Sequence, residues 1–148
     1  MSAQEEIDLL LREELAVARK LLEENGRFYP TASWIDHDGE LAFVGGQTGG
    51  IFARPSEILE MLYAALRQKA AEQAIRACAV AVDVRVVPPG ETRKSNAILV
   101  TIEHAEADPV DVVLPYSKPR FRRTIEYGEQ FAEPGERKIF VRGRAGDR

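Results

Sequence analysis

The residues of this 148-residue chain that are best suited to chemistry are its two histidines and its one cysteine. His104 follows Glu103 at the end of an apolar stretch, and histidine is the side chain that most often serves as a general base. In a cleft, this pair would be the catalytic site of an enzyme that acts on a small anionic substrate. At the margin of a core, His104 would instead be a hydrogen-bonded structural residue.

The other histidine lies in the run Asp36-His37-Asp38, whose oxygen and nitrogen atoms are potential metal ligands. Three adjacent turn residues point in different directions, however, and a closed zinc site needs about four ligands drawn from more than one element. Cys78 stands between two alanines, which indicates a small buried side chain rather than a nucleophile. The sequence therefore predicts no metal centre and no cofactor.

A glycine-rich run, Gly45–Gly50, lies after an expected strand and before an expected helix, where a phosphate-binding loop would lie. It lacks the lysine and hydroxyl residue that a P-loop places at the start of its helix, and it lacks the spacing of a dinucleotide-binding fingerprint. We expect a structural loop here, with a lid over a ligand as the alternative.

The most unusual local composition is that of residues 117–123, where four cations surround one aromatic side chain. Arginine and aromatic residues are typical of protein interfaces, and clustered cations also suit phosphates. The structural alternative is an edge strand that charge and proline protect against unwanted pairing. The candidate interaction surface, for a protein partner or a second copy of the chain, comprises Tyr116, Arg120, Phe121, Arg122, Arg123 and Tyr127.

The overall composition excludes several classes of protein. Hydrophobic residues make up 45% of the chain and charged residues 30%, which is typical of a folded domain. The net charge of −4 argues against nucleic acid as a partner. Apolar runs fall short of the roughly 18 residues that a membrane span needs, and the acidic N-terminus does not resemble a signal peptide. With a single cysteine, the chain is expected to be cytoplasmic and to have no membrane partner.

Two amphipathic helices and five clear strands must position these side chains. Ser2 and Glu5 form a capping box that predicts a helix over residues 2–25, and Gly26 is suited to end it. A second helix is expected over residues 55–74. Alternating apolar residues predict the strands 32–36, 41–44, 76–87, 97–104 and 110–114, with weaker candidates at 121–127 and 138–142.

Short connections between successive strands favour antiparallel pairing. We predict an α+β fold, a two-layer sandwich with the element order α-β-β-α-β-β-β and a C-terminal strand pair. Both helices are expected on the even-numbered face of residues 80–86. Residues 1–142 would form one domain, and residues 143–148 would form a flexible tail.

This order of elements is similar to that of roadblock and profilin-like domains, which are mostly interaction modules. Over residues 10–127 the chain also resembles a group of small bacterial α+β proteins that have no established activity. The residues that carry this resemblance are Phe28-Tyr29-Pro30, the turn Asp36–Gly39, Ile102-Glu103-His104 and Leu114-Pro115-Tyr116. The sequence thus favours a bacterial, cytoplasmic protein-binding module, either self-associating or of the immunity or antitoxin kind, over the enzyme with His104 as its base.

Overall fold

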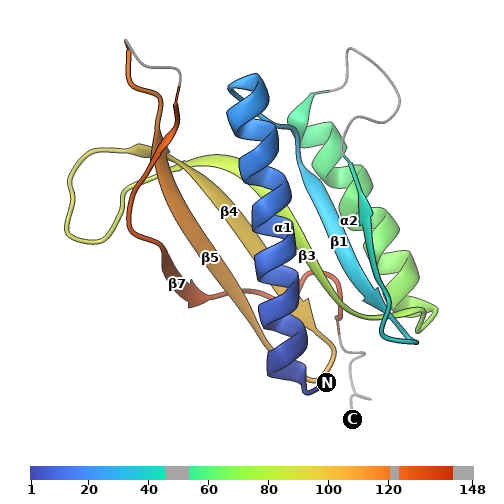
Figure 1. Cartoon of the computed structure of the whole chain (residues 1–148). Coiled ribbons are helices and arrows are strands. Elements are labelled where there is room, and N and C mark those ends of the chain that lie inside the picture. Colours follow the sequence, from blue (N-terminus) through green and yellow to red (C-terminus); the bar gives the residue numbers. More distant parts are fainter. Residues whose placement is uncertain (46–53, 121–123, 142–148) are drawn as a thin grey trace.

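An antiparallel sheet of seven strands forms the middle of the structure, a computed structural model that describes residues 1–45, 54–120 and 124–141 (Figure 1). The strand order is β2-β1-β3-β4-β5-β6, and β7 also pairs with β5. The strands are β1 (Thr31–Asp36), β2 (Leu41–Val44), β3 (Ile75–Val86), β4 (Ser95–His104), β5 (Ala107–Ser117), β6 (Glu126–Tyr127) and β7 (Phe131–Pro134).

Local signals in the sequence place both ends of the first helix and the start of the second. Helix α1 (Ala3–Asn25) has the predicted capping box, because the Ser2 hydroxyl accepts a hydrogen bond from the Glu5 amide at 3.1 Å. It ends at Gly26, whose φ of 77° is in the left-handed region that favours glycine. Helix α2 (Pro55–Ala71) begins with a proline, which needs no amide partner in the first turn.

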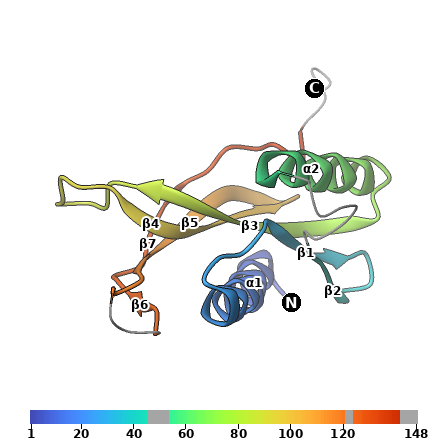
Figure 2. The same ribbon diagram turned by 90° about the horizontal axis from the view of Figure 1, so that it is seen from above.

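The helices lie on opposite faces of the sheet (Figure 2). α1 packs against Ala77, Ala79 and Ala81 of β3, and α2 packs against Cys78 and Val80 of the same strand. The α+β class, the antiparallel sheet, the order of elements and the packing of helices on the sheet are confirmed. The expectation that both helices share the even-numbered face of β3 is wrong, because the small side chains of its alanines let α1 approach the other face.

The antiparallel pairing predicted from short connections is confirmed for β1 and β2, which form a hairpin. Asp36 accepts hydrogen bonds from the amides of Asp38 and Glu40, both at 2.9 Å, and Gly39 has the positive φ of 89° that the turn requires. At the C-terminal end, β6 lies inside the first of the two weak strand candidates. The second candidate, residues 138–142, is wrong for its described part, because residues 138–141 do not form a strand. Strand β7 forms where no strand was expected.

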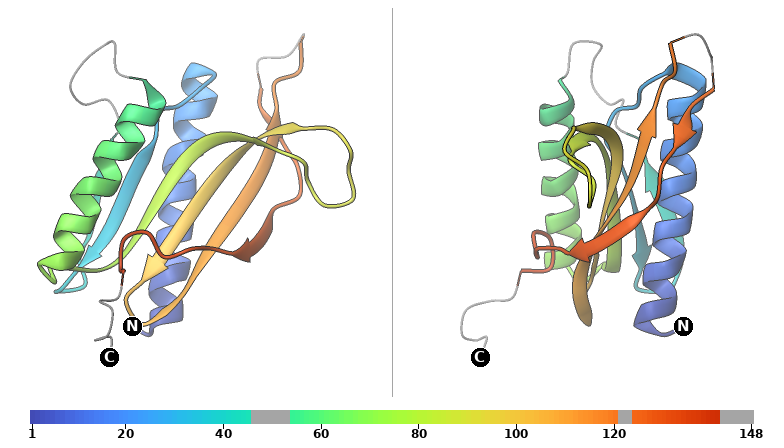
Figure 3. Two further views of the ribbon diagram at one scale, coloured as in Figure 1. Left: turned by 180° about the vertical axis from the view of Figure 1, so that it is seen from behind. Right: turned by 90° about the vertical axis from the view of Figure 1, so that its left-hand side faces the viewer.

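After β7 the chain crosses the sheet and reaches α2 (Figure 3). This segment, Glu136–Phe140, is called the strap. Its Ile139 is buried with the core residues under α2. Arg137 donates to the carbonyl oxygens of His104 and Ala107, and Arg67 of α2 donates to the Lys138 carbonyl at 2.7 Å. The expected tail 143–148 and most of the glycine-rich loop lie outside the described residues.

Candidate functional site

Part of the sheet face on which α2 lies carries no helix. α2 contacts β1 and β3, while β4, β5 and β7 extend beyond it (Figure 3). Strand pairing places Val82, Leu99, Val113 and Phe131 in one row across β3, β4, β5 and β7. Val113 is buried, and the other three are only half-buried. These four residues, together with half-buried Val84, are called the open face.

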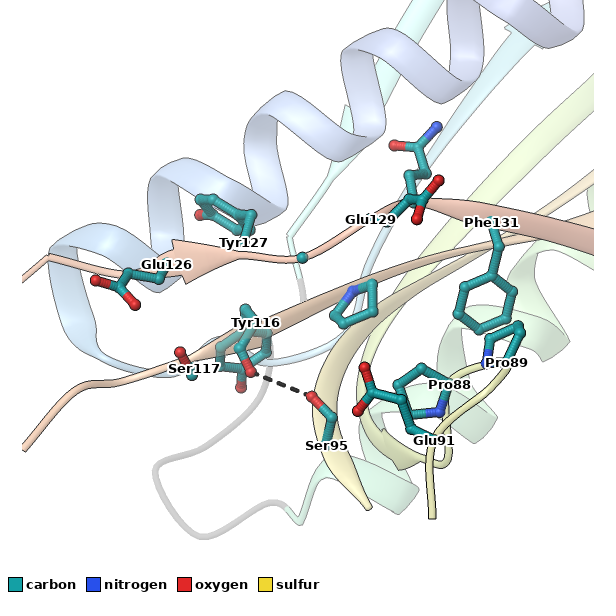
Figure 4. Close-up of a pocket in the computed structure, with 13 residues that line it drawn as sticks. Pro88, Pro89, Glu91, Ser95, Tyr116, Ser117, Glu126, Tyr127, Glu129 and Phe131 are labelled. Carbon is teal, nitrogen blue, oxygen red and sulfur yellow. Dashed lines mark hydrogen bonds between the residues drawn. The ribbon is translucent and has the colours of Figure 1, made fainter. Parts of the chain in front are cut away.

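A groove of about 460 Å³ lies at the end of the open face that is remote from the strap (Figure 4). The connection between β3 and β4 forms one wall, and the chain from β6 to the start of β7 forms the other. Figure 4 shows Phe131 pointing toward the connection that carries Pro88 and Pro89. The residues of the groove used below are Pro88, Pro89, Glu91, Ser95, Glu129 and Phe131.

The charged side chains that line the groove are all carboxylates. Glu91 comes from the connection between β3 and β4, and Glu126 and Glu129 come from the opposite wall. Within the described part of the chain, no ion pair involves Glu91 or Glu129. The groove therefore combines the apolar side chains of Pro88, Pro89 and Phe131 with negative charge.

Two residues of the predicted interaction surface, Tyr116 and Tyr127, lie opposite each other in the β5–β6 pair beside this groove. The Tyr116 hydroxyl donates to Asp83 at 2.7 Å. Burial raises the pKa of Tyr116, and the hydrogen bond to Asp83 raises it further. The pKa of Asp83 is also raised, since its partial burial outweighs that hydrogen bond.

The side chain of Tyr127 is likewise engaged within the protein. Its hydroxyl donates to Glu23 of α1 at 2.6 Å, and the guanidinium of Arg19 lies 4.3 Å from the centre of its ring. Burial, followed by the bond to Glu23, raises the pKa of Tyr127 to about 12. Both tyrosines thus fix the wall of the groove from the α1 side. Arg120 lies exposed in a turn between them, and Phe121, Arg122 and Arg123 lie outside the described residues.

The other predicted pair, Glu103 and His104, does not form one site. The two side chains point to opposite faces of the sheet, as neighbours in a strand do. The Glu103 carboxylate accepts hydrogen bonds from three strap amides, those of Lys138, Ile139 and Phe140, at 2.8–3.1 Å. Its role in the structure is to anchor the strap.

His104 is 3% exposed and has partners at both ring nitrogens. Its Nδ1 accepts from the Glu106 amide at 3.0 Å, so the proton of the neutral ring is on Nε2, which donates to Glu6 at 2.8 Å. The second oxygen of Glu6 accepts from the guanidinium of Arg76. Burial raises the pKa of Glu6, but the bonds from Arg76 and His104 outweigh it, and the pKa is lowered overall. This arrangement leaves His104 no nitrogen for a substrate.

A second buried carboxyl group was also missed by the sequence analysis. Glu14 of α1 is fully buried and accepts a hydrogen bond from the Thr31 hydroxyl. Its other oxygen and the Ser33 hydroxyl have no hydrogen-bond partner among the described residues. Burial raises the pKa of Glu14 despite the bond from Thr31. A neutral carboxyl group can satisfy these atoms, since its proton gives it a donor.

The remaining candidates have structural roles. Asp36 organises the β1–β2 turn, and the His37 carbonyl accepts from Arg76 at 3.2 Å. Burial, and then the nearby carboxylates, raise the pKa of the Cys78 thiol well above its ordinary value, which disfavours the reactive thiolate. Among the described residues, no group of three or more His, Cys, Asp or Glu side chains is placed to hold a metal ion.

The residues of the groove gave only a faint signal in the sequence. Pro88-Pro89-Gly90 predicts a rigid connection that leaves the sheet, and the structure has a positive φ of 80° at Gly90. Phe131 is a lone aromatic residue in a polar stretch. Nothing local indicates that it meets the two prolines, because the contact depends on the pairing of β7 with β5.

The described residues include no helix that is long and apolar enough to cross a membrane. Comparison of the chain with protein-family models, with curated proteins and with solved structures finds no match.

Proposed function

We propose that this protein is a protein-binding module and that its partner covers the open face and the adjoining groove. One observation carries the proposal. A row of apolar side chains crosses four strands, three of its members are half-buried, and no helix of the described structure lies over its far end. Contiguous apolar surface of this kind on a folded domain is typical of an interaction site.

The groove supports a protein as the ligand better than a small anion. An anionic substrate would be repelled by Glu91 and Glu129, whereas the broad apolar sheet face beside the groove suits a polypeptide. The enzyme alternative also lacks a base, since both nitrogens of buried His104 are occupied by Glu6 and Glu106. Of the predicted interaction surface, Tyr116 and Tyr127 line the groove and so lie at the border of the proposed surface.

Photo-cross-linking in the native cells tests this proposal. A photoreactive phenylalanine analogue is placed at position 99 or 84 on the open face, and at the exposed position Met61 of α2 as the control. We expect one protein adduct of defined mass at both open-face positions and not at position 61. An adduct of twice the chain mass identifies the partner as a second copy.

The absence of adducts at positions 99 and 84, or the same adducts at position 61, would contradict the proposal. The enzyme alternative has its own test, a screen with anionic substrates such as phosphate esters. Turnover that is lost in a folded His104→Gln variant would overturn the assignment of a binding module.

A further inference from the structure

The walls of the groove hold Pro88, Pro89 and Phe131 among polar side chains, and these three residues indicate the part of a partner that fits between the walls. Pro88 is buried, and its carbonyl accepts from the Glu91 amide at 3.1 Å, so the connection turns back on itself. Phe131 is held opposite by the pairing of β7 with β5. Rigid walls of this type favour an extended chain with an apolar or proline side chain, because little ordering is needed on binding.

The charge on the groove determines which extended chains are accepted. Glu91 and Glu129 lie on opposite walls, and neither has an ion-pair partner among the described residues. Arg93 and Lys94 belong to the same connection as Glu91 but do not line the groove. A cation in the groove would be attracted by these carboxylates, whereas a phosphate or an acidic side chain would be repelled by them.

We propose that the groove binds an extended protein segment in which an apolar or proline residue lies against Phe131 and the two prolines, and an adjacent arginine or lysine pairs with Glu91 or Glu129. This inference rests on the proposed function and adds the chemistry of the partner. It assigns the cationic side of the interface to the partner and the anionic side to this chain.

Selection from a phage-displayed library of random peptides tests the inference without assuming a sequence. The library is panned on the wild-type protein after depletion on a Glu91→Gln/Glu129→Gln variant. We expect the selected peptides to combine an apolar or proline residue with an arginine or lysine. In polarisation assays their affinity should fall about ten-fold on the double variant, which corresponds to about 1.4 kcal/mol.

A Glu57→Gln/Glu60→Gln variant, which loses the same charge from exposed positions of α2, is the matched control and should bind normally. Phe131→Ala should also weaken binding while thermal unfolding remains cooperative. Selected peptides that are acidic or without charge, or no peptide that depends on the groove, would overturn the inference. Cross-linking at position 99 together with such a failure would leave the proposed function intact.

Discussion

Glu103 offers the sharpest test of how the strap is held. Its carboxylate accepts three backbone amides of the strap, and Glu103→Gln keeps the shape of the side chain while it replaces one acceptor oxygen with an amide donor. At least one strap amide then faces another donor. We therefore expect the substitution to loosen the strap.

The protein can respond to this substitution in two ways, and the response with the smaller free-energy cost determines the loss of stability. If the strap stays in place, a buried amide loses its acceptor, which costs about 1–3 kcal/mol. If the strap leaves, Ile139, which is only 5% exposed, enters water at a cost of about 1.5–3 kcal/mol. We expect the free energy of unfolding to fall by about 2 kcal/mol. For a chain of 148 residues this corresponds to a decrease in Tm of about 4–8 °C.

Thermal unfolding and hydrogen exchange at residues 138–140 measure this effect. The control is Glu106→Gln, which removes the same charge from an exposed side chain. Glu103→Gln and Ile139→Ala weaken the same attachment of the strap. The double variant should therefore lose less stability than the sum of the losses in the two single variants. The reasoning would be refuted by unchanged exchange at these amides, or by fully additive losses of stability.

Three further predictions concern α1. Burial raises the pKa of Glu14, so the stability that this carboxyl group contributes is present below its ordinary pKa of 4.5 and is lost as pH rises. The Glu14→Gln variant does not lose it. Its free energy of unfolding, measured in urea titrations, should therefore rise relative to that of the wild type between pH 4 and pH 8. The pKa of Glu6 is lowered, so its contribution is present above pH 4.5 and lost as pH falls. Glu6→Gln should cost about 1–3 kcal/mol at pH 7, measured by urea unfolding, because an amide has one acceptor oxygen and either the Nε2–H of His104 or the guanidinium of Arg76 then faces another donor. The cost should be smaller in acid. Gly26→Ala should cost about 1 kcal/mol in the same assay, because its φ of 77° strains any residue with a side chain, and Gly45→Ala, where φ is not positive, is the comparison.

The elements that the sequence predicts correctly are those with local causes. The capping box at Ser2, the end of α1 at Gly26 and the turn at Gly39 each depend on a few adjacent residues. The arrangement of the helices on the two faces of the sheet does not depend on adjacent residues. The interpretation of β3 relied on its alternating valines, but its first half is apolar at almost every position, which is typical of a strand buried on both faces. That pattern of apolar residues in β3 predicts helices on opposite faces of the sheet.

The site residues were harder to predict because their partners are distant in the sequence. His104 and Glu6 are 98 positions apart, and no spacing rule connects them. The helix itself held one usable signal. Glu14 is four residues from both Leu10 and Ala18, which are buried, so the helical period places it on the apolar side of α1. Glu6 is four residues before Leu10 and lies on the same side, and the structure buries it beneath Arg76.

The two buried carboxyl groups fix α1 on its face of the sheet. Glu6 and Glu14 are held by partners on β4 and β1, respectively, and about 12 Å of helix separates them. Two fixed points prevent α1 from sliding or rotating, since a shift of one residue would leave both groups buried without partners. Helix α1 is therefore fixed on this face of the sheet. The proposed partner is therefore assigned to the other face, where α2 stops short and the apolar row continues into the groove.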